Sequence, residues 1–123
     1  METSSEKKAA VRGNRPNYST LTPLLSVHDV PKLLDFLKRA FGAREKSRFT
    51  SEDGTVMHAE VEIGNSILML GEVRKGDIPI TSGFYMYVDN ADNVFDQALK
   101  AGAESLMQPS NQFYGDRGGA VRD

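Results

Sequence analysis

The sequence contains one strand–helix pattern twice, and this repeat constrains the fold more than any other feature. The first copy occupies residues 20–43 (TLTPLLSVHDVPKLLDFLKRAFGA) and the second occupies residues 82–103 (SGFYMYVDNADNVFDQALKAGA). Each copy reads as an apolar strand, a turn that contains Asp or Asn, an amphipathic helix and a glycine that ends the helix. Within 123 residues, such a repeat indicates one small domain built from two similar units.

The two copies also agree residue by residue. Val27 aligns with Val88, and Asp29 aligns with Asn90. The helix positions follow in the same register: Leu33 with Val94, Leu34 with Phe95, Asp35 with Asp96, and Gly42 with Gly102 after a shift of one residue. Asp and Asn at the turn predict helix N-caps, because their side-chain oxygens accept hydrogen bonds from amides of the first turn.

Turn sequences divide the rest of the chain into strands. Glu52-Asp53-Gly54 and Gly64-Asn65 predict tight turns, which glycine allows through positive φ. The first module, residues 20–72, is expected to form a strand at 21–27, a helix, and strands at 44–50, 55–63 and 66–70. The second module, residues 82–123, is expected to form a strand at 84–88, a helix at 91–101, a strand at 104–108, a loop at 109–119 and the start of a strand at 120–123. It lacks a counterpart of the first module's last strand.

Composition favours a cytoplasmic globular protein. Residues 1–18 are polar and aperiodic, which predicts a disordered arm before a single domain at 19–123. The net charge of −2 gives no broad attraction to nucleic acid, and no apolar run approaches the roughly 20 residues of a membrane span. The amino end has no apolar signal core, so we expect neither secretion nor import. Because the sequence has no cysteine, disulfides, thiolate metal ligands and a cysteine nucleophile are excluded.

Four segments carry a resemblance to a known family. They are SVHDVPKLLDFLKRAFGA, HAEVEIGNSILML, FYMYVDNADNVFDQALKAGA and QFYGDRGGAVRD, in this order. Together they resemble the glyoxalase/bleomycin-resistance/extradiol-dioxygenase group, also called the vicinal oxygen chelate superfamily, and within it the small bacterial glyoxalase-like proteins. The resemblance covers residues 21–123. It implies an α+β fold of two tandem βαβββ modules that form a curved mixed sheet around a cleft, usually in a homodimer, with the second module here incomplete.

The metal enzymes of this family hold a divalent cation with His, Glu or Gln side chains from the first and last strands of each module. Carried over to this sequence, three of the four positions fall on Thr22, Gly83 and Met69, and the fourth lies beyond Asp123. Glycine offers no ligand atom, and a Thr hydroxyl and a Met thioether are poor ligands for hard divalent ions. We therefore expect no metal, no cofactor and no catalytic residues, which argues against an enzyme.

A separate polar cluster lies in TVMHAEVEI. Strand alternation puts His58, Glu60 and Glu62 on one face of the sheet. Two interpretations stay open for this cluster: an exposed polar face with a single histidine, or a His–carboxylate pair that shares a metal or a proton. His28, just before the helix cap, reads as a turn residue.

The expected cleft is apolar and aromatic. The repeat places Tyr85 and Tyr87 opposite Leu24 and Ser26, and the resemblance places further side chains in the cleft or at its rim. The complete set of expected ligand-binding residues is Tyr85, Tyr87, Met69, Phe113, Tyr114, Arg117, His58 and Glu60. Tyr and Met make adaptable apolar walls with a few polar handles, which suits the capture of a small molecule.

The sequence thus predicts a non-metal protein of the bleomycin-resistance type that sequesters a small molecule in a dimeric cleft. Two alternatives are a metal-dependent glyoxalase-like lyase or dioxygenase with ligands at other positions, and a degenerate domain that serves only assembly. The expected partners are an unknown small molecule and a second copy of the chain. The two copies are expected to form a homodimer, with a swapped dimer as one alternative. Nucleic acid and membranes are not expected partners.

Overall fold

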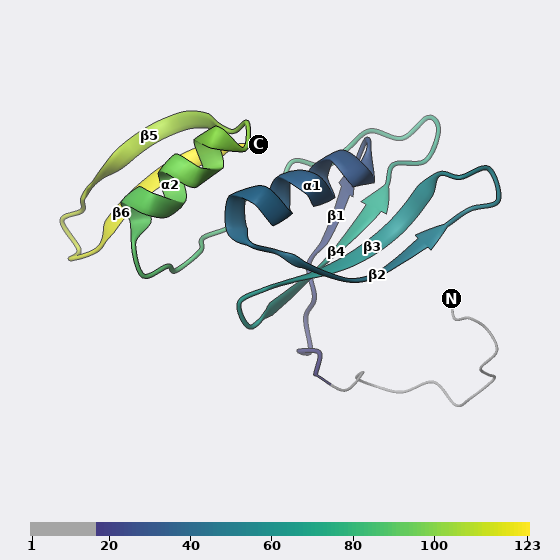
Figure 1. Cartoon of the computed structure of the whole chain (residues 1–123), viewed down its shortest axis with the longest axis horizontal. Helices are drawn as coiled ribbons and strands as arrows, with labels where there is room; N and C mark the ends of the chain where they lie inside the picture. Colours follow the sequence, from purple (N-terminus) through teal and green to yellow (C-terminus); the bar gives the residue numbers. More distant parts are fainter. Residues whose placement is uncertain (1–16) are drawn as a thin grey trace.

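The computed structural model describes residues 17–123 and shows an α+β protein in which two units lie side by side (Figure 1). Residues 1–16, most of the predicted disordered arm, lie outside the described residues. The first unit contains β1 (Leu24–Val27), α1 (Val30–Phe41), β2 (Arg44–Thr50), β3 (Val56–Ile63) and β4 (Ser66–Glu72). The second contains α2 (Ala91–Lys100), β5 (Glu104–Asn111) and β6 (Arg117–Arg122). The predicted fold class is confirmed.

The first unit forms a mixed four-stranded sheet, sheet A, in the order β1-β4-β3-β2. Strands β2, β3 and β4 form an antiparallel meander, as the turn sequences predict. Strand β1 pairs with β4 in parallel, with Leu24 opposite Met69. A parallel pair needs a long crossover connection, which α1 and the meander supply. Strand β1 begins at Leu24 and not at Leu21 as predicted, and the intervening Pro23 has no N–H for a strand ladder.

The second unit forms only a two-stranded sheet, sheet B, in which β5 and β6 are antiparallel. The predicted strand at 84–88 is wrong, because this segment pairs with no strand among the described residues. Its counterpart β1 is held by β4, and residues 17–123 contain no second-unit counterpart of β4. An extended segment without a partner has no ladder of hydrogen bonds, so the local strand pattern of 84–88 does not become a strand.

The predicted loop at 109–119 is also wrong. Strand β5 continues to Asn111 and β6 already begins at Arg117, so a short turn joins them. The loop is predicted because residues 109–119 are rich in Asn, Gly and aromatic residues, and they begin with Pro109, a residue that usually interrupts a ladder. Here it falls inside a register shift between Met107 and Ser110, where no donor is required of it.

The hydrophobic core lies between α1 and one face of sheet A. Its largest fully buried side chains come from the helix and from the two central strands: Leu34, Leu70, Val30 and Val61. Leu37 is also buried, at 7% exposure, as the helical spacing of apolar residues predicts. Burial of a side chain of this size stabilises the fold by roughly 1.5–3 kcal/mol.

The helix starts confirm the repeat. The side chain of Asp29 accepts the backbone N–H of Lys32 at α1, and the side chain of Asn90 accepts the backbone N–H of Asn93 at α2. The two aligned residues, Asp29 and Asn90, therefore both act as helix N-caps.

The two units are joined through their helices. Helix α1 packs against α2 (Figure 1), and Gln97 Nε2 donates to the carbonyl oxygen of Arg39 at 2.8 Å. In return, the Arg39 guanidinium donates to the carbonyl oxygen of Ala101 at 3.2 Å. Within residues 17–123, neither helix has the length and apolarity needed to cross a membrane.

Candidate functional site

Strand β3 presents different side chains to the two faces of sheet A. Val61 is fully buried on the α1 side, so the alternating His58 and Glu60 lie on the other side, which we call the open face. Across the sheet on the same face, Glu60 is opposite Met69 of β4, and Met69 is opposite Leu24 of β1. The structure therefore brings three of the predicted site residues, His58, Glu60 and Met69, onto one surface.

Glu60 is buried on this face, at 5% exposure. The hydroxyl of Tyr18 donates to one oxygen of the Glu60 carboxylate, and His58 Nε2 lies 3.6 Å from the other. Lys46 Nζ lies 6.0 Å from the centroid of the Tyr18 ring. The exposed-face interpretation is therefore wrong for Glu60, which is only 5% exposed. The sequence pattern contains no sign of the contact with Tyr18, since Tyr18 is 42 residues away from Glu60.

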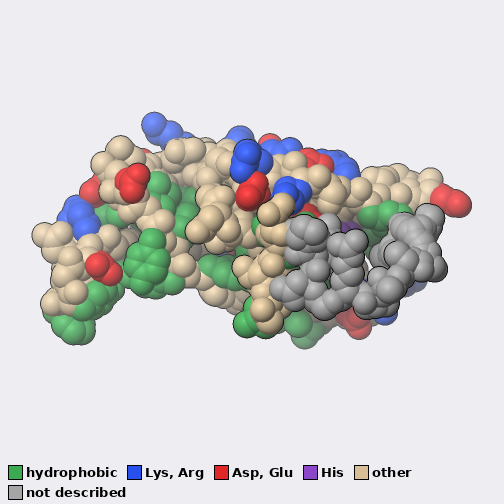
Figure 2. Space-filling view, turned by 90° about the horizontal axis from the view of Figure 1, so that it is seen from below, with side chains coloured by type: hydrophobic (Ala, Val, Ile, Leu, Met, Phe, Trp, Pro, Cys, Tyr) green, Lys and Arg blue, Asp and Glu red, His purple; other side chains and the backbone are tan. Residues whose placement is uncertain are grey.

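The second unit carries four aromatic rings in a connected series, which we call the ring cluster. The ring centroids of Tyr85 and Tyr87 are 5.2 Å apart, as are those of Phe113 and Tyr114. The hydroxyls of Tyr85 and Tyr114 are 3.4 Å apart and link the two pairs. Figure 2 shows hydrophobic side chains gathered over the second unit, at the left of the view. All four rings are exposed, from 54% for Tyr114 to 99% for Phe113.

The hydroxyl contact within the ring cluster changes the acidity of Tyr85. The pKa of Tyr85 is raised to about 12, mainly by the hydrogen bond with Tyr114. Partial desolvation and nearby negative charge contribute less. The shift moves the ionisation of Tyr85 further above physiological pH, where a tyrosine with the ordinary pKa of 10 is already neutral. The ring cluster is thus an apolar wall with hydroxyl groups as its polar handles.

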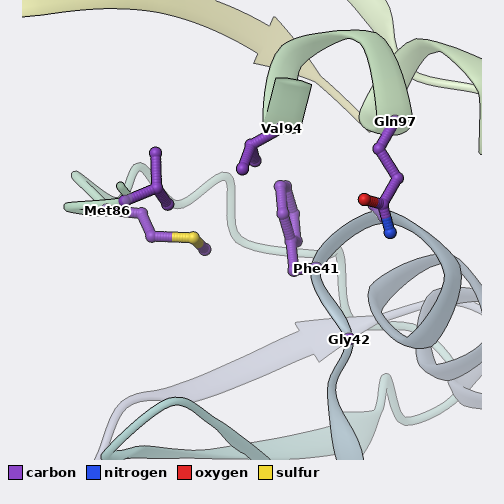
Figure 3. A pocket seen from close by; sticks show the side chains of 7 residues that line it. Phe41, Gly42, Met86, Val94 and Gln97 are labelled. Atoms are coloured by element: carbon purple, nitrogen blue, oxygen red, sulfur yellow. The ribbon is translucent and has the colours of Figure 1, made fainter. Parts of the chain in front are cut away.

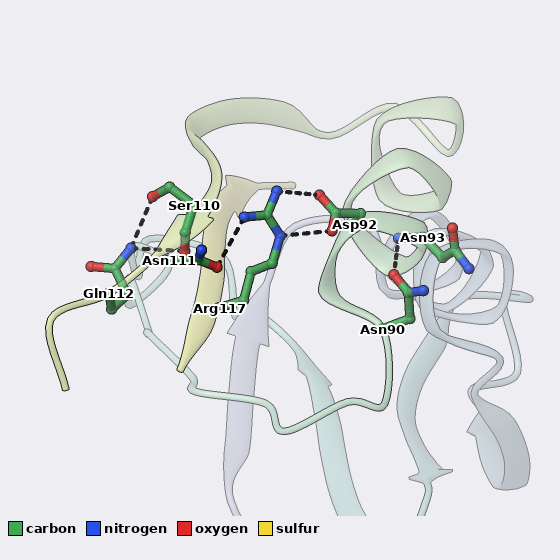
Figure 4. A network of polar contacts seen from close by, with 7 residues as sticks. All are labelled: Asn90, Asp92, Asn93, Ser110, Asn111, Gln112 and Arg117. Carbon is green, nitrogen blue, oxygen red and sulfur yellow. Dashed lines mark hydrogen bonds and ion pairs between the residues drawn. The ribbon is translucent and has the colours of Figure 1, made fainter. Parts of the chain in front are cut away.

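Arg117 is held within the chain (Figure 4). Its guanidinium donates to both carboxylate oxygens of Asp92, at 2.8 and 3.1 Å, and to Asn111 Oδ1 at 3.2 Å. The hydrogen bonds raise the pKa of Arg117 and lower the pKa of Asp92. The pair ties the start of β6 to the first turn of α2. Arg117 thus supports the hairpin that carries Phe113 and Tyr114, and its predicted contact with a ligand stays a prediction.

Sequence reasoning missed a shallow hollow of about 220 Å³ between the end of α1, helix α2 and segment 84–88 (Figure 3). It is lined by Ala40, Phe41, Gly42, Met86, Val88, Val94 and Gln97. Its walls come from three segments distant in sequence, so no local pattern marks it. In the first unit, the fully buried Leu70 of β4 packs under α1. Met86 and Val88 line the hollow, whereas Tyr85 and Tyr87 of the same segment are not among its lining residues.

The positions that hold a metal in the family do not form a metal site here. Thr22 lies near Met69, because the carbonyl oxygen of the next residue in the chain, Pro23, accepts the backbone N–H of Met69 at 2.9 Å. A hydroxyl and a thioether make a donor set that does not fit a hard divalent cation, and Gly83 adds no side chain. Among residues 17–123 there is no group of three His, Cys, Asp or Glu placed to hold a metal ion.

Comparison with known proteins identifies the class to which this fold belongs. Residues 20–123 match the Glyoxalase/Bleomycin resistance protein/Dioxygenase superfamily, which is most of the chain. The chain belongs to this superfamily, and the resemblance stated from its sequence is confirmed.

Several individual proteins are similar to this chain in sequence or structure. An uncharacterized protein of Mycobacterium bovis is 32% identical over 116 residues, covering 84% of this chain and 75% of that protein. Among solved structures, TioX from Micromonospora is 27% identical with a TM-score of 0.63, covering 85% of this chain and 87% of TioX. A glyoxalase I mutant from Zea mays has a TM-score of 0.66 at 16% identity, over 84% of this chain and 40% of that one, and this likeness shows the fold alone.

Proposed function

We propose that this chain is a cytoplasmic binding protein that sequesters a small aromatic molecule, without a metal, in a cleft shared by two copies of the chain. The observation that carries the proposal is the ring cluster. Four connected rings stand in water in a single copy, with Tyr87 at 83% and Phe113 at 99% exposure. Stacking of a flat ligand on such rings removes apolar surface from water on both partners.

The dimer is proposed because one copy supplies the two halves of a cleft on separate surfaces. The open face of sheet A offers the His58–Glu60 pair beside Met69, and the second unit offers the ring cluster. A second copy can bring its ring cluster over the open face of the first. A ligand between them would have aromatic walls on one side and a few polar groups on the other, which is the usual character of a small-molecule site.

The donor chemistry supports binding over metal-dependent catalysis. A lyase or dioxygenase of this family uses the metal as Lewis acid and template. Thr22, Met69 and Gly83 do not fit that metal, and within residues 17–123 His58 and Glu60 belong to no group of three His, Cys, Asp or Glu that could hold one. No step through a metal is therefore assigned to this chain.

The proposal is tested by native mass spectrometry of the whole chain with a panel of planar aromatic compounds, both neutral and cationic. We expect a dimer that retains one or more compounds from the panel. The double variant Tyr85→Ser/Tyr87→Ser should lose this binding by at least about tenfold, since each aromatic contact contributes on the order of 1 kcal/mol. The matched control is Ile78→Ser, which also replaces an exposed apolar residue, at 81% exposure, outside the ring cluster.

Three results would overturn the proposal. They are a dimer that binds no member of the panel, binding that the double variant leaves unchanged, and a ligand bound only to a single copy. The first result would favour the assembly-only alternative.

A further inference from the structure

Tyr18 is placed against the open face in the manner of a bound ligand. It precedes β1, yet its hydroxyl reaches Glu60 on β3, and β4 lies between those two strands. Its side chain is half-buried, and the carboxylate that accepts its hydrogen bond belongs to a residue that is only 5% exposed. A phenol thus sits on the open face, with its hydroxyl on a buried carboxylate.

The surroundings of this phenol are selective for such a group. A carboxylate accepts an O–H donor strongly, and a charge-assisted hydrogen bond of this kind is about twice as strong as a neutral one. His58 Nε2 lies 3.6 Å from the second oxygen of the Glu60 carboxylate. The ammonium of Lys46, 6.0 Å from the centroid, lies over the ring, which attracts a cation through its negatively charged face.

We propose that Glu60 and His58 form a recognition site for a phenolic hydroxyl, and that Tyr18 of the same chain occupies this site when no ligand is bound. This inference rests on the proposed binding of an aromatic molecule and names its chemical class, a phenol. An incoming phenol takes the place of the Tyr18 hydroxyl on Glu60. Because Tyr18 is tethered, it competes at an effective concentration in the millimolar range, so a phenol displaces it either at a higher concentration or through further contacts on the open face.

The test uses 4-methylphenol, the side chain of tyrosine as a free molecule, and isothermal titration calorimetry. Tyr18→Ala should bind it at least about tenfold more tightly than the wild-type chain, because the tethered competitor is gone. Tyr18→Phe keeps the ring in place, so it should not gain this binding. Toluene, which has the ring without the hydroxyl, should bind Tyr18→Ala at least about tenfold more weakly than 4-methylphenol, since it has no O–H to donate to the carboxylate.

A matched pair of variants assigns the binding to Glu60. Added to Tyr18→Ala, the change Glu60→Gln should abolish the gain, because it removes the charged acceptor while keeping the shape. Glu62→Gln changes the same residue type on the same face of β3, where the carboxylate pairs with Arg44, and should keep the gain. If Tyr18→Ala fails to fold, the wild-type chain decides: saturating 4-methylphenol should shift the NMR resonances of the Tyr18 ring, and unshifted resonances would overturn the site.

The outcomes separate this inference from the proposed function. If Tyr18→Ala binds 4-methylphenol no better than the wild type while the aromatic panel still binds through Tyr85 and Tyr87, the phenol site is overturned and the binding function stands. If the panel does not bind but Tyr18→Ala gains binding that depends on Glu60, the phenol site stands and the aromatic cleft is overturned. Equal binding of toluene and 4-methylphenol would show a simple apolar gap and would also overturn the inference.

Discussion

The carboxylate of Glu72 accepts the backbone N–H of Asp29 at 2.9 Å, and its other oxygen accepts the N–H of Val30 at 3.0 Å. One side chain at the end of β4 therefore satisfies two donors at the start of α1. It also holds Asp29 in a left-handed conformation, with φ of 69°, which a residue other than glycine rarely adopts. The parallel pairing of β1 and β4 places the acceptor where the helix begins.

Glu72→Ala should therefore destabilise the chain by about 1–2 kcal/mol, because the helix start loses a charged acceptor for two N–H groups. Urea unfolding followed by circular dichroism measures the change. The control is Glu52→Ala in the exposed turn before β3, where a change within about 0.5 kcal/mol is expected. Equal effects of the two substitutions would contradict this role of Glu72.

Leu37→Ala should lower the free energy of unfolding by about 2–5 kcal/mol, since it opens a cavity in the core between α1 and sheet A. The comparison is Leu106→Ala on β5, a residue that is 59% exposed, for which we expect less than about 0.5 kcal/mol. Denaturant unfolding at equilibrium gives both values. A loss below about 0.5 kcal/mol at Leu37 would mean that this helix face does not pack on the sheet.

Glu45 should contribute to the acid sensitivity of the fold. Hydrogen bonds from Arg48, at 2.6 and 2.9 Å, and then from Lys38, at 3.0 Å, lower its pKa from the ordinary 4.5 to about 2. A carboxyl with a lowered folded-state pKa stabilises the fold above its unfolded pKa, and this contribution is lost as the pH falls from 4.5 to about 2. Glu45→Gln should flatten the stability curve in that window.

The measurement for Glu45 is the thermal midpoint as a function of pH in the wild type and the variant. Asp53 and Asp92 also have lowered pKa values, so the curve should flatten without becoming level. Arg48→Gln keeps the carboxyl but removes its main donor, and should move the Glu45 transition towards its ordinary pH range. Identical curves for wild type and Glu45→Gln would contradict the assignment.

Tyr114→Phe should bring the pKa of Tyr85 down from about 12 towards its ordinary value of 10, because the hydrogen bond with Tyr114 is the main cause of the shift. Ultraviolet absorbance during an alkaline titration follows the ionisation of the tyrosines. Tyr87→Phe removes a neighbouring ionisable hydroxyl without removing this hydrogen bond, and should leave most of the shift in place. An unchanged late transition in Tyr114→Phe would show that another contact raises the pKa.

Removal of metal should not affect stability. Thr22, Met69 and Gly83 stand at the family's ligand positions and do not fit a divalent cation. We expect the thermal midpoint of the purified chain to be the same with and without EDTA. A fall of several degrees that zinc, nickel or manganese restores would show a metal site built from other residues.

Local features of the fold could be predicted from the sequence. The caps at Asp29 and Asn90, the buried face that contains Leu37 and the turn at 52–54 all depend on residues within one or two helical turns of each other. Periodicity and capping report such features directly.

Features that depend on distant partners could not be predicted. Segment 84–88 has the apolar pattern of a strand, but a strand exists only through hydrogen bonds to a neighbour. Glu60 accepts a hydrogen bond from Tyr18, 42 residues away, and the ring cluster depends on a hairpin whose strands extend into the predicted loop. For the same reason, the alternation on β3 identified the face of His58 and Glu60 but gave no information about what covers it.

The parallel pairing of β1 with β4 also determines the order in which the first unit is completed. Leu24 meets Met69 only after the whole meander has been made, so β1 has no backbone partner while α1, β2 and β3 are being synthesised. Contacts between residues this far apart in sequence are slow to form, because the loop between them loses entropy before the contact forms. Until β4 is made, β1 therefore has no partner for its edge and α1 lacks Leu70, one of the side chains on which it packs, so that β4 completes both contacts.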